Sequence, residues 1–206
     1  MASSIIHICV AKEVNKYLKR NEKEILIGSI APDISKQIGR TKKKSHFLDK
    51  QDNIPNINKF LKKYKNHLIN DFVMGYFIHL YTDYLWFKFF IPNFIKDKKI
   101  YKITGETVEL SDEESLKLIY NDYTTLNRIL LDEYELDLSI FYEELPKIKS
   151  IIKEIPMRKL QIIIDKAGII IKNSTCSKPY IFDKEIINNF IEFSTNYILT
   201  KLDELN

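Results

Sequence analysis

Glycine and proline are scarce in this chain, with five glycines and six prolines among 206 residues. Because these two residues interrupt helices most strongly, long stretches without them favour a helical fold. Long apolar runs are also missing, since no window of about eighteen residues is apolar throughout and free of charge. We therefore expect no membrane-spanning helix.

Cysteine is rare as well. Cys9 and Cys176 are the only two, and neither lies in a C-x-x-C pair, so the sequence contains no disulfide framework. We expect both to be reduced thiols in the core. The first residues lack a basic segment, and His7 interrupts their apolar run, so we predict no signal peptide and a cytoplasmic, soluble protein.

The residues that are present describe a globular chain. Apolar residues make up 45% and aromatic residues 12%, which argues against disorder. The length favours one domain over residues 1–206. A net charge of +4 tolerates an anionic partner but is weaker than the basic patch expected of a nucleic-acid-binding protein.

Apolar residues recur at helical spacing along most of the chain. Ser111 followed by Glu114 is a capping box, and Asp183 is a second capping candidate. The pattern predicts an all-α, multi-helix bundle with helices over 4–19, 22–30, 55–65, 69–90, 111–133, 139–154, 156–172 and 184–203. Residues 34–53 are expected to be an ordered loop, and 100–108 can be extended.

The helix expected over 69–90 is the most apolar part of the chain, yet it contains His79 and Asp83. Four residues apart on a helix, their side chains share one face. Gly75, one turn earlier, would let another segment or a metal ligand approach closely. An unpaired buried carboxylate costs several kcal/mol, so Asp83 needs a cation or a network of donors. We interpret the cation as a metal.

Three other residues carry suitable ligand atoms. His7 falls on the apolar stripe of its helix, Asp33 follows Pro32 at a helix end, and His46 follows a lysine cluster. Imidazole nitrogen and carboxylate oxygen together suit zinc or a related divalent ion. His67, near a helix start, has no evident partner and is expected to be solvated.

Four segments in order resemble the metal-site motifs of the zinc-dependent phospholipase C family, which shares a superfamily with the P1-type nucleases. They are His7 with Ala11, the Leu-Ile-Gly-Ser-Ile-Ala-Pro-Asp run ending at Asp33, Ser45-His46-Phe47, and the run from Gly75 to Asp83. The resemblance covers about residues 1–90, with 91–206 as a supporting helical half. It implies the phospholipase C/P1 nuclease fold and a phosphoester-hydrolysing activity.

The resemblance also implies residue roles. Asp33, His46, His79 and Asp83 would hold one Zn²⁺, and Asp83 would bridge to a second ion that His7 also binds. Asp33 would then be the general base for the attacking water, whose pKa a bound metal lowers towards about 7. Among Lys42 to Lys44, Lys44 is the candidate phosphate contact.

The chain departs from the family in two places. Three-metal members use the amino terminus of a processed tryptophan, whereas this chain begins with Met1 six residues before His7. They also use further histidines and a glutamate after the bridging aspartate, but no histidine follows His79. Asp122, among aromatic residues, is a candidate substitute ligand or a residue supporting the ligands.

Several alternatives stay open at this point. His79 and Asp83 can be an internal hydrogen-bonded pair, and His7 a satisfied core histidine. The chain can be a degenerate family member with a structural metal and a binding or scaffold role, or a P1-like nuclease acting on nucleic acid. The favoured substrate is a small phosphoester or a phospholipid headgroup. The sequence leaves the oligomeric state open.

Overall fold

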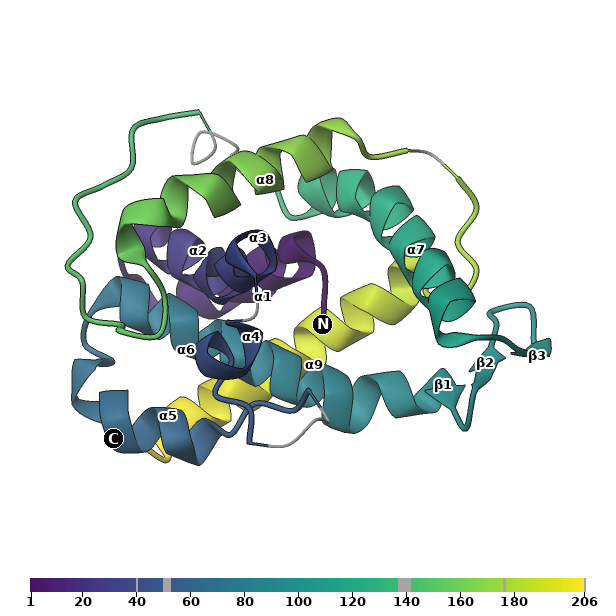
Figure 1. Cartoon of the computed structure of the whole chain (residues 1–206), viewed down its shortest axis with the longest axis horizontal. Helices are drawn as coiled ribbons and strands as arrows, with labels where there is room; N and C mark the ends of the chain where they lie inside the picture. The colour runs from purple at the N-terminus through teal and green to yellow at the C-terminus, as the bar shows by residue number, and fades with distance from the viewer. Residues whose placement is uncertain (40, 50–52, 137–141, 176, 206) are drawn as a thin grey trace.

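The computed structural model describes residues 1–39, 41–49, 53–136, 142–175 and 177–205, and it is mostly helical (Figure 1). The helices are α1 (Ser4–Leu18), α2 (Glu22–Ile30), α3 (Ser35–Ile38), α4 (Lys42–Ser45), α5 (Ile57–Tyr64), α6 (Asp71–Leu85), α7 (Asp112–Glu133), α8 (Leu160–Lys172) and α9 (Lys184–Asp203). The all-α prediction is therefore confirmed at the level of class, with one addition. A small antiparallel sheet, ordered β1 (Ile95–Lys96), β2 (Lys99–Tyr101) and β3 (Thr107–Glu109), lies at one edge of the molecule before α7.

Local capping explains where several predicted helices begin. The Ser3 hydroxyl accepts a hydrogen bond from the N–H of Ile6 at the start of α1. Ser111 and Glu114 form the expected capping box of α7, and the Asp183 carboxylate caps α9. These side chains satisfy N–H groups that have no partner within the helix. The predicted helix over 69–90 divides into α6 and a π-helical turn from Trp86 to Phe90.

The helix predicted over 139–154 is wrong where the structure describes it. Residues 142–154 form no helix there, while 139–141 lie outside the described residues. Pro146 supplies no N–H and disfavours helical geometry at Leu145. The segment is anchored by side chains instead: the Tyr64 hydroxyl donates to Glu154 Oε2 at 2.6 Å, and Ile152 is buried. The loop expected over 34–53 is also more regular than predicted, since it contains α3 and α4.

Helix α6 is the centre of the fold. Every residue from Phe72 to Asp83 is buried, as expected for a helix that is apolar on all sides. Its most extensive contact is with α2, where Gly28 and Gly75 face each other. A Cβ added to Gly75 would lie 2.1 Å from the carbonyl oxygen of Ile25. The predicted close approach at Gly75 is thus confirmed, and the segment that approaches is α2.

The second half of the chain packs around this centre. Helix α7 contacts α1, α8 and α9, and α8 contacts the turn Ala31–Ile34 that follows α2. One cluster of buried apolar side chains includes residues from both halves, from Ile5 to Leu202. Cys9 is a free, buried thiol as predicted, whereas Cys176 lies outside the described residues. In the described part of the chain, no helix has the length and apolarity needed to cross a membrane.

Candidate metal centre

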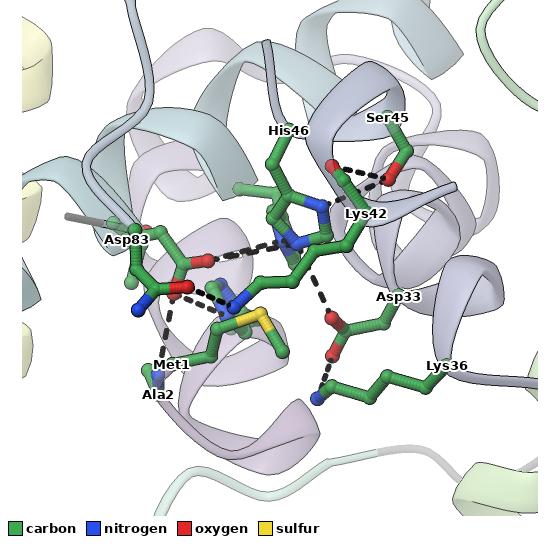
Figure 2. A network of polar contacts seen from close by, with 12 residues as sticks. Met1, Ala2, Asp33, Lys36, Lys42, Ser45, His46 and Asp83 are labelled. Atoms are coloured by element: carbon green, nitrogen blue, oxygen red, sulfur yellow. Dashed lines mark hydrogen bonds and ion pairs between the residues drawn. The ribbon is translucent and has the colours of Figure 1, made fainter. Parts of the chain in front are cut away.

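Five predicted ligands converge in the interior, and none is more than 1% exposed. His79 and Asp83 come from α6, and His7 comes from α1. Asp33 lies in the 3₁₀ turn after α2, and His46 directly follows α4. Figure 2 shows Asp33, His46 and Asp83 directed toward a common centre from separate elements. The structure thus brings together the five residues that the sequence singled out as candidate ligands.

Hydrogen bonds orient the two central imidazoles. His79 Nδ1 lies 2.6 Å from the carbonyl oxygen of Ser29, which can only accept, so Nδ1 carries the proton. His46 Nδ1 lies 2.8 Å from the Ser45 hydroxyl, which itself donates to the carbonyl oxygen of Lys42. Ser45 therefore accepts from His46. In their neutral forms, both histidines therefore present the Nε2 lone pair to the centre, as a metal ligand must.

Two of the distances between candidate ligand atoms match a tetrahedral site closely. Neighbouring ligand atoms around zinc lie about 3.3–3.4 Å apart when metal–nitrogen distances are about 2.0–2.1 Å. The Nε2 atoms of His46 and His79 are 3.3 Å apart, and His46 Nε2 is 3.4 Å from Asp33 Oδ1. Asp83 Oδ2 is 3.7 Å from both Nε2 atoms. Two bare nitrogen lone pairs at 3.3 Å repel each other unless a cation or proton lies between them.

Four nitrogen and oxygen atoms of the cluster, two of them already named on its aspartates, lack hydrogen-bond partners among the described residues. Asp33 Oδ1, Asp83 Oδ2 and both ring nitrogens of His7 are buried and make no hydrogen bond among the described residues. Native proteins rarely leave buried polar atoms in this condition without an ion, a water or a catalytic role. The donor set, the distances and the unpartnered atoms together fit a divalent metal such as zinc.

The potential ligands form two groups that share His79. Asp33, His46 and His79 make one group, and His7, His79 and Asp83 make the other. His7 Nε2 lies 3.4 Å from Asp83 Oδ1, and its ring stacks on that of His79 with centroids 3.8 Å apart. The N–H of Ala2 also donates to Asp83 Oδ1 at 3.2 Å. Asp83 thus presents one oxygen to each side, the arrangement expected of a bridging carboxylate.

Charge and burial set the protonation of these groups. Burial alone would raise the pKa of Asp33, but the Lys36 ammonium and His46 outweigh it and hold that pKa well below its usual value. Burial alone would likewise raise the pKa of Asp83, but its contact with His7 and the positive charges around it hold that pKa below the usual value. Burial, with His7 adding to it, lowers the pKa of His79 well below its usual value. Both aspartates are therefore carboxylates and His79 is neutral, which suits metal binding.

A cavity of about 670 Å³ borders the cluster. Asp33 lines it, together with Lys36 and Lys42. Lys36 Nζ donates to Asp33 Oδ2 at 2.8 Å. The Asp33 oxygen that faces the other candidate ligands, Oδ1, is thus a different atom from the one that Lys36 holds. The candidate ligands therefore lie beside a cavity of the size typical of small-molecule sites.

Two predicted residues lie elsewhere. The carboxylate of Asp122 accepts three backbone hydrogen bonds, from Tyr180 at 2.8 Å, Ile181 at 2.6 Å and Phe182 at 2.9 Å. It belongs to neither ligand group among the described residues, and its contacts give it a structural role. Lys44 is exposed, and the described cavity lining includes Lys42 rather than Lys44. Arg40 of the same basic cluster lies outside the described residues.

Sequence reasoning missed three contributors. The Ser29 carbonyl is a backbone group and has no signal of its own in the sequence. Lys36 did have a signal, since it follows Asp33 by three residues and such a pair can meet on a helical turn. The cavity wall formed by α7 and α8 depends on packing between distant segments. His67, by contrast, is exposed as expected.

Comparison with known proteins adds no relative: no family model, no curated protein and no solved structure matches this chain. The interpretation of the site therefore depends on its own geometry and on the sequence resemblance.

Proposed function

We propose that this protein is a metal-dependent hydrolase of phosphoesters, similar to the zinc-dependent phospholipase C family. One observation supports this most strongly: the buried oxygen and nitrogen atoms of Asp33, His46, His79 and Asp83 converge, and both carboxylate oxygens directed at the centre lack other partners. These four residues would hold one Zn²⁺. His7, on the other side of Asp83, would contribute to a second divalent ion.

The proposed reaction is hydrolysis at phosphorus. The oxygen of water bonds to phosphorus, the bond from phosphorus to the alcohol oxygen breaks, and the alcohol leaves with a proton. When bound, a divalent metal would lower the pKa of its water and neutralise charge on the phosphoryl oxygens. The chain itself orients the imidazoles through Ser29 and Ser45 and supplies positive charge through Lys36 and Lys42.

Asp33 suits the role of ligand better than that of general base. The Lys36 ammonium and His46 hold its pKa well below the usual value despite burial. A carboxylate with such a low proton affinity is a weak base near neutral pH. In this proposal Asp33 binds metal through Oδ1, while Lys36 fixes its other oxygen.

A structural metal in a binding protein is the second candidate. It is favoured by the complete burial of the ligands, because a structural zinc site is closed by four protein ligands. The cavity that reaches Asp33 favours the hydrolase, since a catalytic site must admit substrate.

The test combines metal analysis with activity. The protein is purified without chelator, and zinc per chain is measured for the wild type, His79→Ala, Asp83→Asn and His7→Ala, with exposed His67→Ala as the matched control. We expect two metals in the wild type and the control, one in the His7 variant, and release of phosphate or alcohol from a generic phosphoester. Circular dichroism verifies that each variant is folded.

Other results would count against parts of this proposal. Wild-type protein without bound metal would overturn the metal centre. A single tightly held ion, without turnover of any phosphoester, would overturn the hydrolase and favour the structural metal.

A further inference from the structure

The cavity beside the metal centre has two chemically different sides. Its cationic end contains Lys36 of α3 and Lys42 of α4, next to Asp33. Its other side is formed by α7 and α8 and is mostly apolar, although Lys166 of α8 also lines it. The apolar residues of this wall include Leu116, Ile119, Ile163, Ile169 and Ile170. A ligand that fills this space therefore needs an anionic end and an apolar end.

The two lysines differ in how their charges are balanced. Lys36 Nζ pairs with Asp33 Oδ2 at 2.8 Å. Lys42 Nζ donates to the neutral amide oxygen of Asn53 at 2.6 Å and makes no ion pair within the described part of the chain. Figure 2 shows the Lys42 side chain extending across the front of the cluster, and Lys36 reaching Asp33 from the other side. Lys42 thus contributes a positive charge without an anionic partner.

Burial lowers the pKa of Lys42 below its usual value, and the like charge of Lys36 acts in the same direction, against the attraction of Asp83 and Asp33. The two ammonium groups are therefore close enough to repel each other electrostatically. An anion between them would relieve this repulsion and pair the charge on Lys42.

A charge count indicates how much negative charge the site can take. The carboxylates of Asp33 and Asp83 balance the ammonium groups of Lys36 and Lys42, and imidazoles are neutral when they bind a metal. Each divalent ion of the proposed centre then adds two positive charges, and Lys166 at the cavity adds one more. The dianion of a phosphomonoester would neutralise more of this excess than a phosphodiester, which carries one negative charge.

We propose that the cavity binds phosphomonoesters with an apolar alcohol portion, their phosphate against Lys36 and Lys42 and their apolar portion against α7 and α8. This assignment rests on the proposed function for the divalent ion in the charge count. A cavity of about 670 Å³ lies within the range of about 300–1,000 Å³ typical of small-molecule sites.

The probe is octyl phosphate, compared with methyl octyl phosphate, octanol and inorganic phosphate on the zinc-loaded full chain. Binding is measured by calorimetry and by the fluorescence of Trp86, which is the single tryptophan and lines the cavity. We expect octyl phosphate to bind at least tenfold more tightly than each of the other three. Equal affinity for methyl octyl phosphate would overturn the preference for monoesters.

Two pairs of variants test the two sides of the cavity. Lys42→Gln should weaken octyl phosphate binding about tenfold, the worth of roughly one charge-assisted contact. Lys44→Gln, an exposed lysine of the same helix, should leave it unchanged. Ile169→Ser should weaken the binding of octyl phosphate but not that of inorganic phosphate. Ile162→Ser is the control, because Ile162 lies on α8 outside the described lining. Equal effects within either pair would overturn the placement of that end of the ligand.

The outcomes separate this proposal from the proposed hydrolase. Tight, Lys42-dependent binding without turnover would support the binding site and contradict the hydrolase. Turnover of phosphodiesters together with weak binding of octyl phosphate would support the hydrolase and overturn the monoester site. If the chain binds no zinc, the titration with octyl phosphate is made on the metal-free protein. Equal affinity of the wild type and Lys42→Gln in that titration would overturn the proposal.

Discussion

The two halves of the chain contribute different parts of the site. Residues 1–90 supply every candidate metal ligand, and α1, α2 and α6 bring them together in the interior. Residues 91–206 supply the apolar wall of the cavity through α7 and α8. The first half therefore supplies the candidate ligands, and the second half shapes much of the cavity beside them. A substitution in the second half should therefore leave metal binding by the first half unchanged, provided that the protein still folds.

The largest effect is expected at Asp122 in the second half. Asp122→Ala would leave three backbone N–H groups without their acceptor, two of them in the buried residues Ile181 and Phe182. Each unsatisfied buried donor costs about 1–3 kcal/mol, so the free energy of unfolding should fall by about 4 kcal/mol. Urea unfolding measures this change.

Zinc per folded chain should stay unchanged in this variant, because Asp122 lies in neither ligand group among the described residues. Asp122→Asn, which keeps one acceptor oxygen, should be less destabilising. Loss of a metal ion from folded Asp122→Ala protein would show that the two halves are not separable in this way.

A smaller loss, about 3 kcal/mol, is expected for Gly75→Ala in the first half. The new Cβ would lie 2.1 Å from the Ile25 carbonyl oxygen, so α2 and α6 must move apart. Ser29 lies one turn after Ile25 and His79 one turn after Gly75, and we expect zinc affinity to fall along with stability. Unfolding in urea and zinc titration against a competing chelator measure the two effects.

Gly39→Ala is the control for this substitution. Among the described residues, no atom lies within 4 Å of a Cβ built at Gly39, but its φ of 72° is unfavourable for other residues. It should cost about 1 kcal/mol through backbone strain alone and leave zinc affinity unchanged. Unchanged zinc affinity in Gly75→Ala would mean that the approach of α2 to α6 does not position the ligands.

The smallest expected effect is on the pH dependence of the metal-free protein. Burial holds the pKa of His79 well below the ordinary 6.5, so the unfolded chain binds a proton below pH 6.5 while the folded chain does not. Through His79 alone, stability should therefore fall as the pH drops, by about 2 kcal/mol between pH 7 and pH 5. Asp33 and Asp83 have lowered pKa values too, but their contribution is lost only below about pH 4, outside this window.

Unfolding curves of metal-free wild type and His79→Gln at several pH values measure this slope. The variant should show a shallower slope, and exposed His67→Gln should behave as the wild type. A slope that is identical in His79→Gln would assign the pH dependence to other groups.

The sequence was a good guide where local rules apply. Capping residues and apolar spacing placed α1, α2, α7 and α9 within a residue or two, because those signals act within one turn of the helix. The clustered histidines and aspartates could be singled out as candidate ligands because histidine is rare in the chain and His79 and Asp83 stand out in an apolar run. The helix expected over 139–154 failed because tertiary anchors, such as Tyr64 with Glu154, hold its described part in another conformation.

The sequence by itself determined the helical class, the ends of α1, α2, α7 and α9 and which residues are candidate ligands, since each follows from residue chemistry or from neighbours within one turn. Only the tertiary structure decided which nitrogen of His79 faces the centre, that Lys42 rather than Lys44 lines the cavity, and that Asp122 binds backbone rather than sharing the metal site. The reason is physical: each of these depends on a contact between segments far apart in the chain, and local periodicity carries no information about such contacts.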